Sequence, residues 1–368
     1  MIVCIRLIGD VILTTPLIGL LRDACPDAAI DLLVERGTGE FLEKDPRVRQ
    51  VLYFERGGSG YYRKIFQRYD LAINMNASDR GNLAVLLAGR SQRVGFYLGS
   101  SFGKDIWKRL FFTHAIKFPQ EIPVARYCAS IAASLAIPVK QLTVKVFWDQ
   151  ADENRVTGLI SERVGSRPFF VVHPFARWIY KFWRFDRFAE ASDAIARRYG
   201  LQPVWTSSPA PDEMIQLEKA AKQCLIQPVL LRGELTLNQM TCLLSHAAFY
   251  LGLDTAVTHL AASTGVPVVA LYGPTFTKRW FPWDNSGAPA QGCPSARGIL
   301  QRGKIVVLQK DLECMPCGKA GCDDSGESES PCLTGIGVED VLSAVELALK
   351  HGEICNEPSV IEENVTNV

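Results

Sequence analysis

Short apolar runs alternate with stretches of helical periodicity along most of the chain. In the first half, the runs predict buried strands and the stretches between them predict amphipathic helices. Strands are expected at residues 2–5, 29–34, 50–54, 71–75, 93–96 and 144–148, and helices at residues 11–24, 82–89 and 124–136. Alternation of this kind predicts a parallel sheet with helices on both faces.

A polar segment at residues 150–167 separates this half from a second half with the same layout. Gly200 and Gly265 are expected to end helices, and Thr236 is expected to cap one. Strands are expected at residues 168–173, 202–206, 229–231, 249–253 and 267–272, and helices at residues 185–199, 211–224, 237–247, around His259 and at 338–350.

The sequence therefore predicts an α/β protein with two Rossmann-like, doubly wound lobes facing across a cleft. We expect a first lobe at residues 1–160, a second at 161–350 and a polar, loosely ordered tail at 351–368. In open α/β sheets, ligands bind beyond the carboxyl ends of the strands. Loops from both lobes would then line one crevice.

Composition narrows the class of protein. The chain has 368 residues, which is more than a single core normally holds, and 48% of them are apolar. A net charge of +1 argues against a nucleic-acid partner. No apolar run reaches the length of a membrane span and no signal-peptide pattern opens the chain, so we expect a cytoplasmic protein whose 11 cysteines are mostly reduced.

Residues 251–263, with the sequence LGLDTAVTHLAAS, predict a buried strand followed by a short helix. Asp254 is a preferred N-cap residue type. The first N–H groups of a helix lack intrahelical partners, and the helix dipole attracts anions to that end. Thr255 and His259 are four residues apart and would face the same side. This junction is a predicted phosphate-binding site.

A second junction of this type lies at residues 6–16, with the sequence RLIGDVILTTP. Gly9 allows close approach of the backbone, and Asp10 would lie at the cleft with a carboxylate able to accept a proton. The alternative is that Asp10 only caps a helix. Thr14 and Thr15, followed by a proline, fit poorly in a helix interior, which favours a functional segment.

Two further segments follow predicted strands of the second half. In residues 173–183, Arg177 and Lys181 would neutralise a diphosphate; the alternative is a solvated basic loop with packed aromatic residues. In residues 273–283, a Gly-Pro turn and hydroxyl groups would shape a nucleotide pocket, whereas Trp280 and Trp283 are equally suited to packing at a lobe edge.

Four cysteines near the end of the chain have the spacing C-x2-C-x4-C-x9-C. Three interpretations stay open: a structural metal site, disulfide pairs or free thiols. None requires catalysis by cysteine. The chain lacks the sequence motifs of serine hydrolases, P-loop kinases, HExxH metalloproteases and classical dinucleotide-binding enzymes. The cysteines are Cys314, Cys317, Cys322 and Cys332.

These motifs together resemble those of the ADP-heptose:lipopolysaccharide heptosyltransferases, which form glycosyltransferase family 9, and most closely the heptosyltransferase III branch. The element D-T-A-x-x-H-L-A-A is the most specific match. The matching segments cover nearly the whole chain in the family's order: residues 6–16, 173–183, 254–262, 273–283 and the cysteine-rich segment that ends in Cys332-Leu333.

The resemblance implies a GT-B fold and an inverting transfer of heptose from ADP-heptose to the inner core of lipopolysaccharide. It implies no catalytic metal. The one candidate cofactor is the structural zinc ion that the cysteine spacing leaves open. The acceptor would be lipid-linked, which implies transient contact with the inner face of the cytoplasmic membrane. The alternatives are a GT-B transferase with another nucleotide sugar or glycan acceptor, and a non-catalytic sugar-nucleotide-binding protein.

The resemblance also implies roles for individual residues. Asp10 matches the general base, and Lys181 matches a residue that contacts the donor phosphate. The remaining expected donor-binding residues are Arg177, Asp254, Thr255, Ala256 and His259, and the expected acceptor-binding residues are Arg6, Thr14 and Thr15.

This sequence departs from the family pattern in three places. The loop between Arg6 and Gly9 is shorter than is common, Ala256 replaces a frequent glycine, and Phe175-Ala176 replaces residues that carry hydroxyls in some members. The donor phosphate would then depend more on Lys181, Arg177 and backbone N–H groups.

Overall fold

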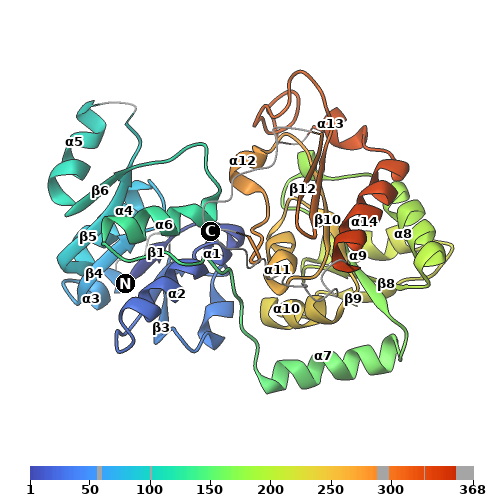
Figure 1. Ribbon diagram of the computed structural model, residues 1–368, viewed down its shortest axis with the longest axis horizontal. Coiled ribbons are helices and arrows are strands. Elements are labelled where there is room, and N and C mark those ends of the chain that lie inside the picture. The colour runs from blue at the N-terminus through green and yellow to red at the C-terminus, as the bar shows by residue number, and fades with distance from the viewer. Residues whose placement is uncertain (56–59, 100–101, 288–297, 327, 354–368) are drawn as a thin grey trace, which may run out of the picture.

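Two sheets, one in each half of the chain, form the centres of two lobes (Figure 1). The computed structural model describes residues 1–55, 60–99, 102–287, 298–326 and 328–353. In the first lobe the strand order is β3-β2-β1-β4-β5-β6 and every pair is parallel. The strands are β1 (Ile2–Cys4), β2 (Asp31–Glu35), β3 (Gln50–Phe54), β4 (Tyr69–Asn74), β5 (Gly89–Tyr97) and β6 (His114–Lys117).

Helices cover both faces of the first sheet. On one face, α2 packs on α6; on the other, the helices α3, α4 and α5 enclose a separate apolar core that includes Tyr61, Val85 and Phe112. The helices are α1 (Ile8–Ile12), α2 (Thr15–Ala24), η1 (Glu40–Lys44), α3 (Gly60–Ile65), α4 (Asp79–Ala88), α5 (Phe102–Phe111), η2 (Val124–Arg126) and α6 (Tyr127–Ser134).

The second lobe has the strand order β12-β13-β11-β10-β7-β8-β9, in which only the β12–β13 pair is antiparallel. Its strands are β7 (Phe169–His173), β8 (Gln202–Ser207), β9 (Val229–Arg232), β10 (Tyr250–Leu253), β11 (Val268–Tyr272), β12 (Gly298–Arg302) and β13 (Ile305–Gln309). Its helices are α7 (Gln150–Arg163), η3 (Ile179–Lys181), α8 (Phe185–Tyr199), α9 (Pro211–Ala221), α10 (Leu237–His246), α11 (Ala256–Thr264), α12 (Thr277–Trp280), α13 (Pro331–Thr334) and α14 (Val338–Glu353).

The predicted fold class is confirmed, and so are the predicted helix ends. Gly200 and Gly265 both end their helices in the left-handed conformation, with φ of 66° and 79°. Thr236 forms a reciprocal capping box with Gln239 at the start of α10. Of the predicted polar tail, residues 354–368 lie outside the described residues. No described helix is long and apolar enough to cross a membrane.

Two sequence predictions of local structure were wrong. Residues 144–148 form no strand, because the backbone of Val144 pairs with the side chain of Asn285 across the two lobes. No element was predicted for the polar segment after it, and most of this segment is helix α7, which Asp149 and Asp152 start with a capping box. The helix predicted at residues 11–24 is broken, since Thr15 donates to the carbonyl of Ile12.

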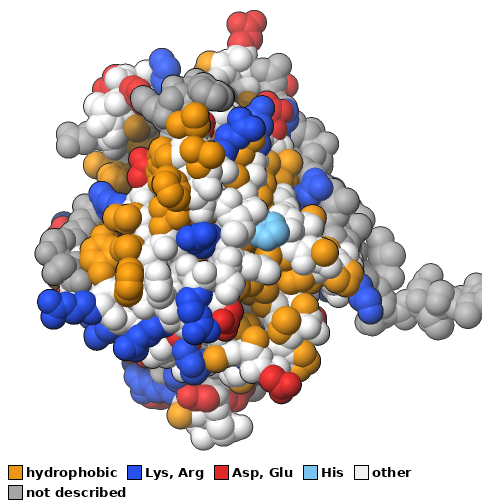
Figure 2. Space-filling model, turned by 90° about the vertical axis from the view of Figure 1, so that its left-hand side faces the viewer, with side chains coloured by type: hydrophobic (Ala, Val, Ile, Leu, Met, Phe, Trp, Pro, Cys, Tyr) orange, Lys and Arg blue, Asp and Glu red, His pale blue; other side chains and the backbone are white. Residues whose placement is uncertain are grey.

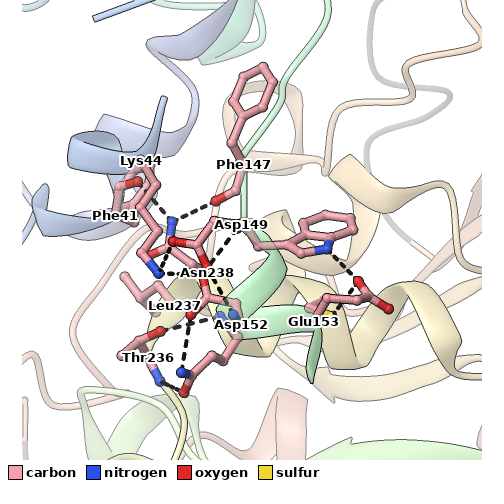
Figure 3. Close-up of polar contacts among 12 residues, drawn as sticks. Phe41, Lys44, Phe147, Asp149, Asp152, Glu153, Thr236, Leu237 and Asn238 are labelled. Atoms are coloured by element: carbon pink, nitrogen blue, oxygen red, sulfur yellow. Dashed lines mark hydrogen bonds and ion pairs between the residues drawn. The ribbon is translucent and has the colours of Figure 1, made fainter. Parts of the chain in front are cut away.

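Polar contacts join the lobes next to α7 and α10 (Figure 3). The Nδ2 of Asn238 donates to the carbonyl oxygens of Phe41, at 2.9 Å, and Phe147, at 2.6 Å. Lys44, from η1 of the first lobe, lies 2.6 Å from the carboxylate of Asp152 on α7. One apolar cluster also runs from α2 and α6 to α10 and α11. These contacts hold the lobes in one arrangement.

We expect Asn238→Ala to lower the free energy of unfolding by about 1–3 kcal/mol, because it leaves two carbonyl oxygens without their donor. Denaturant unfolding measures the change. Asn154→Ala on α7 is the matched control, since the Asn154 side chain bonds only to exposed Gln150 and its loss should matter little. Equal stability of the two variants would contradict a role for Asn238 in joining the lobes.

Candidate functional site

A cleft of about 530 Å³ lies between the lobes at the carboxyl ends of β1, β2 and β10. Both segments that the sequence singled out as strand-to-helix junctions reach it. From the first lobe the lining comprises residues 6–10 and 35–38, and from the second lobe Arg177, Trp178, Lys181, residues 254–256, His259 and Trp280. The predicted crevice between two lobes is therefore present.

Gly9 and Asp10 lie in α1, directly after β1. A Cβ atom at Gly9 would lie 3.4 Å from Cδ2 of His259, which is an ordinary van der Waals distance, so the two lobes are in close contact here. Asp10 is not the N-cap residue of this helix, because Leu7 holds that position; Asp10 lies in the first turn. The interpretation of Asp10 as a helix cap is therefore wrong.

The Asp10 carboxylate is nearly buried, with 15% of its side chain exposed, and its Oδ1 lies 3.6 Å from Nε of Arg6. Burial raises the pKa of Asp10 above its ordinary value, and the positive charge of Arg6 opposes part of this rise. A carboxylate held in this way is a stronger base than an exposed one.

On the opposite wall, the junction between β10 and α11 differs from the prediction in one respect. The N-cap of α11 is Thr255 rather than Asp254, and Thr255 makes no side-chain bond to the helix. Asp254 instead accepts hydrogen bonds from Lys181 Nζ and Thr275 Oγ1, both at 2.5 Å. A charged partner outcompetes the backbone N–H groups for this carboxylate, which leaves the helix start without a side-chain acceptor.

His259 lies on α11 and is buried against this wall. Its Nδ1 has no hydrogen-bond partner in the part of the chain that the structure describes. Burial lowers the pKa of His259 to about 4, so the imidazole is neutral at pH 7. Arg177 lies at the exposed rim, with its guanidinium 5.2 Å from the centre of the Trp178 ring. The predicted donor residues therefore line one wall of one cleft.

A second cavity of about 280 Å³ shares Arg6 and Asp10 with the cleft and extends into the first lobe. Three buried polar atoms that line it have no hydrogen-bond partner within hydrogen-bonding geometry among the described residues: Nδ2 of Asn76, Oη of Tyr127 and Nε of Arg279. Unsatisfied buried groups of this kind cost free energy in an empty cavity and are typical of a site built for a polar ligand. The charge of Arg279 acts on Tyr127 and on Asp10.

Two of the three predicted acceptor residues line the second cavity, and the third does not. Arg6 and Thr14 line the second cavity, and Thr14 Oγ1 donates to the carbonyl oxygen of Asp10 at 2.9 Å. Thr15 lies outside it: its hydroxyl donates to Ile12 and accepts from the N–H of Lys145. Sequence reasoning did not single out Asn76 or Tyr127, and it named Arg279 only as part of residues 273–283; the available signal for Asn76 was that residues 76–78 follow the predicted strand at 71–75.

The four cysteines of the C-x2-C-x4-C-x9-C pattern lie between β13 and α14, and all the described cysteines are free thiols. Burial raises the pKa of Cys332 to about 11, and the negative charges of the other three thiolates add to the rise. The described residues bring three metal-binding donor atoms within 4.8 Å of one another only at Glu153, Cys242 and His246. In this group, Cys242 and His246 donate hydrogen bonds to the Glu153 carboxylate, and so does Trp148.

The two doubly wound lobes and the cleft that they share define the fold class as GT-B. A solved glycosyltransferase family 9 protein from Veillonella parvula superposes with a TM-score of 0.76 at 18% identity and covers 95% of this chain and 96% of its own. The Escherichia coli ADP-heptose lipopolysaccharide heptosyltransferase II superposes with a TM-score of 0.70 at 21% identity and covers 96% of this chain and 98% of its own.

The family follows from the sequence. The profile of glycosyltransferase family 9 (heptosyltransferase) matches residues 62–291, so the chain belongs to this family. Lipopolysaccharide heptosyltransferase 3 of Escherichia coli is 28% identical over 295 residues, which cover 76% of this chain and 85% of the relative. The similarity to a type 3 enzyme agrees with the branch that the sequence motifs indicate.

Proposed function

We propose that the protein transfers heptose from ADP-heptose to a sugar of the lipopolysaccharide inner core, with inversion at the transferred carbon. The curated relative is a lipopolysaccharide heptosyltransferase, and a structural neighbour is named for ADP-heptose. The observation that carries the proposal is the position of Asp10, where a cleft lined by Lys181 meets a cavity lined by unpartnered polar atoms.

The second-lobe wall is the proposed donor site. Lys181 and Arg177 supply positive charge to the diphosphate, and the start of α11 at Thr255 and Ala256 supplies backbone N–H groups. Neutral His259 adds a hydrogen-bonding group without adding charge. Because these groups lie in a partly closed cleft, they stabilise the charge that develops on the departing ADP.

The first-lobe cavity is the proposed acceptor site. Asn76 and Arg279 offer donors, and Tyr127 offers a hydroxyl that can donate or accept. These groups suit a sugar with several hydroxyls, and Arg279 together with Arg6 suits one that also carries a negative charge.

The reaction needs one proton acceptor. The acceptor hydroxyl attacks the anomeric carbon from the side opposite ADP, and Asp10 takes the hydroxyl proton as the new C–O bond forms. The bond between the anomeric carbon and the phosphate oxygen breaks, its electron pair leaves with ADP, and the configuration inverts.

The four cysteines are proposed to hold a structural zinc ion, away from the cleft. Thiolates are good zinc ligands, and the charges of the other three cysteines act on Cys332. Zinc would require the sulfurs to move closer together, since no three of them meet within 4.8 Å. Elemental analysis of the purified protein tests the proposal: absence of zinc contradicts it.

A binding panel followed by a transfer assay tests the main proposal. ADP, but neither UDP nor GDP, should raise the melting temperature, because only a ligand of the native state stabilises it. Purified protein with ADP-heptose and truncated core acceptors should then form a glycosylated product. Preference for UDP or GDP would point to another nucleotide sugar, and ADP binding without transfer to any acceptor would favour a non-catalytic binding protein.

A further inference from the structure

Large apolar side chains are exposed on the outer side of the first lobe, around α5. Ile106 and Leu110 lie one turn apart on this helix, and Phe111 is next to Leu110; their exposed fractions are 39%, 73% and 57%. Leu98, just after β5, is also exposed. We call Leu98, Ile106, Leu110 and Phe111 the α5 patch. Clustered exposed apolar residues of this kind mark an interaction surface.

The chain around the α5 patch is strongly basic. Residues 60–120 contain ten Lys or Arg against three Asp, a net of +7 in a chain whose total is +1. All three acidic side chains are engaged within the protein: Asp70 pairs with Arg90, and Asp79 and Asp105 with Lys108. In Figure 2, which looks at this end of the molecule, hydrophobic and basic side chains lie next to one another. The exposed bases are Arg63, Lys64, Arg68, Arg80, Arg90, Arg109 and Lys117.

The α5 patch is continuous with the cavity that we assign to the acceptor. Leu98 belongs to both, because it is exposed and also lines that cavity. The backbone N–H of Gly99 donates to Asp105 at 2.6 Å, which ties the start of α5 to the end of β5. Lys108 lies 2.9 Å from Asp79, at the start of α4 beside cavity residue Ser78. A surface that binds the α5 patch would therefore lie beside the acceptor opening.

We propose that the α5 patch and its basic surroundings dock the protein on the surface of an anionic phospholipid bilayer. Apolar side chains insert into the headgroup region while Lys and Arg attract acidic lipids, and the two effects reinforce each other. The inference rests on the proposed function, because a lipid-anchored acceptor would reach the acceptor cavity from the membrane surface. Docking then presents the acceptor sugar to Asp10.

Vesicle sedimentation tests the docking surface. The full chain should sediment with vesicles of phosphatidylglycerol and phosphatidylcholine, but not with phosphatidylcholine alone, and added salt should release it. The variant Leu110→Glu/Phe111→Glu should lose roughly tenfold in vesicle affinity. The matched control is Ile215→Glu/Leu225→Glu in the second lobe, where the two residues are 51% and 76% exposed. It makes the same change in charge and should bind as the parent does.

Unchanged vesicle binding by the α5 variant, at an unchanged melting temperature, would overturn the proposal, as would an equal loss in the control. A parent dimer that the α5 variant converts to monomer, with vesicle binding intact, would assign the patch to a second copy of the chain and also overturn it.

A paired transfer assay separates this inference from the proposed function. With acceptor in vesicles the α5 variant should lose transfer, and with delipidated, soluble core oligosaccharide it should match the parent. A loss of equal size with both acceptors would contradict docking. If the parent transferred heptose to neither acceptor, the proposed function would fail, while the sedimentation result would still decide the docking surface.

Discussion

Asp10→Asn is expected to reduce turnover by about 10²–10⁴-fold, the range that a positioned general base contributes. The amide keeps the shape of the side chain but cannot accept the proton of the attacking hydroxyl. ADP affinity should change little, because the cations of the donor wall stay in place. Steady-state transfer kinetics measure the first quantity and calorimetry the second. Asp23→Asn, which alters an exposed carboxylate on α2, should leave both unchanged.

The raised pKa of Asp10 leads to two further expectations, one for the pH dependence of activity and one for the stability of Asp10→Asn. Burial raises the pKa of Asp10, so on acidification activity should fall at a higher pH than an ordinary aspartate would give. Arg6→Gln removes the positive charge that opposes this rise in the pKa of Asp10. The fall in activity on acidification should then begin at a still higher pH. Because a raised pKa means that ionised Asp10 destabilises the fold at neutral pH, Asp10→Asn should melt no lower than the parent. Near-full activity of Asp10→Asn would disprove the base assignment.

Local signals were enough to predict most of the elements that position this site. Strand β1 and strand β10 are short apolar runs, and each is followed by a residue pattern that starts a helix. The helix stops at Gly200 and Gly265 depend only on a residue that adopts positive φ without strain. Such signals lie within a few residues of the element that they specify, so they can be recognised without the rest of the fold.

Features that depend on distant residues were not predictable in this way. Asn76, Tyr127 and Arg279 come from three separate parts of the chain and share a cavity only once both lobes have formed. Asp254 has the chemistry of a helix cap, yet Lys181, 73 positions away, takes its carboxylate. The β12–β13 hairpin was missed as well, since no prediction covered residues 298–309.

The pairing of Lys181 with Asp254 yields the second large expected effect. Lys181→Ala should weaken ADP binding roughly 30- to 200-fold, since truncating one partner of a largely buried charge pair costs about 2–3 kcal/mol or more. Two changes contribute: a cation is lost from the diphosphate site, and a carboxylate only 8% exposed is left facing that site. Calorimetry with ADP measures the effect, and Lys219→Ala, on the outer surface of α9, is the control.

A double variant separates these two contributions. Asp254→Asn in the Lys181→Ala background removes the repelling charge but keeps an oxygen that can accept from Thr275, which now donates to Asp254. If repulsion from Asp254 causes part of the loss, the double variant should bind ADP more tightly than Lys181→Ala alone. If the two bind equally, the whole loss belongs to the contact between Lys181 and phosphate. Unchanged ADP affinity in Lys181→Ala would show that Lys181 does not belong to the donor site, because a diphosphate bound beside this ion pair would interact with the positive charge of Lys181.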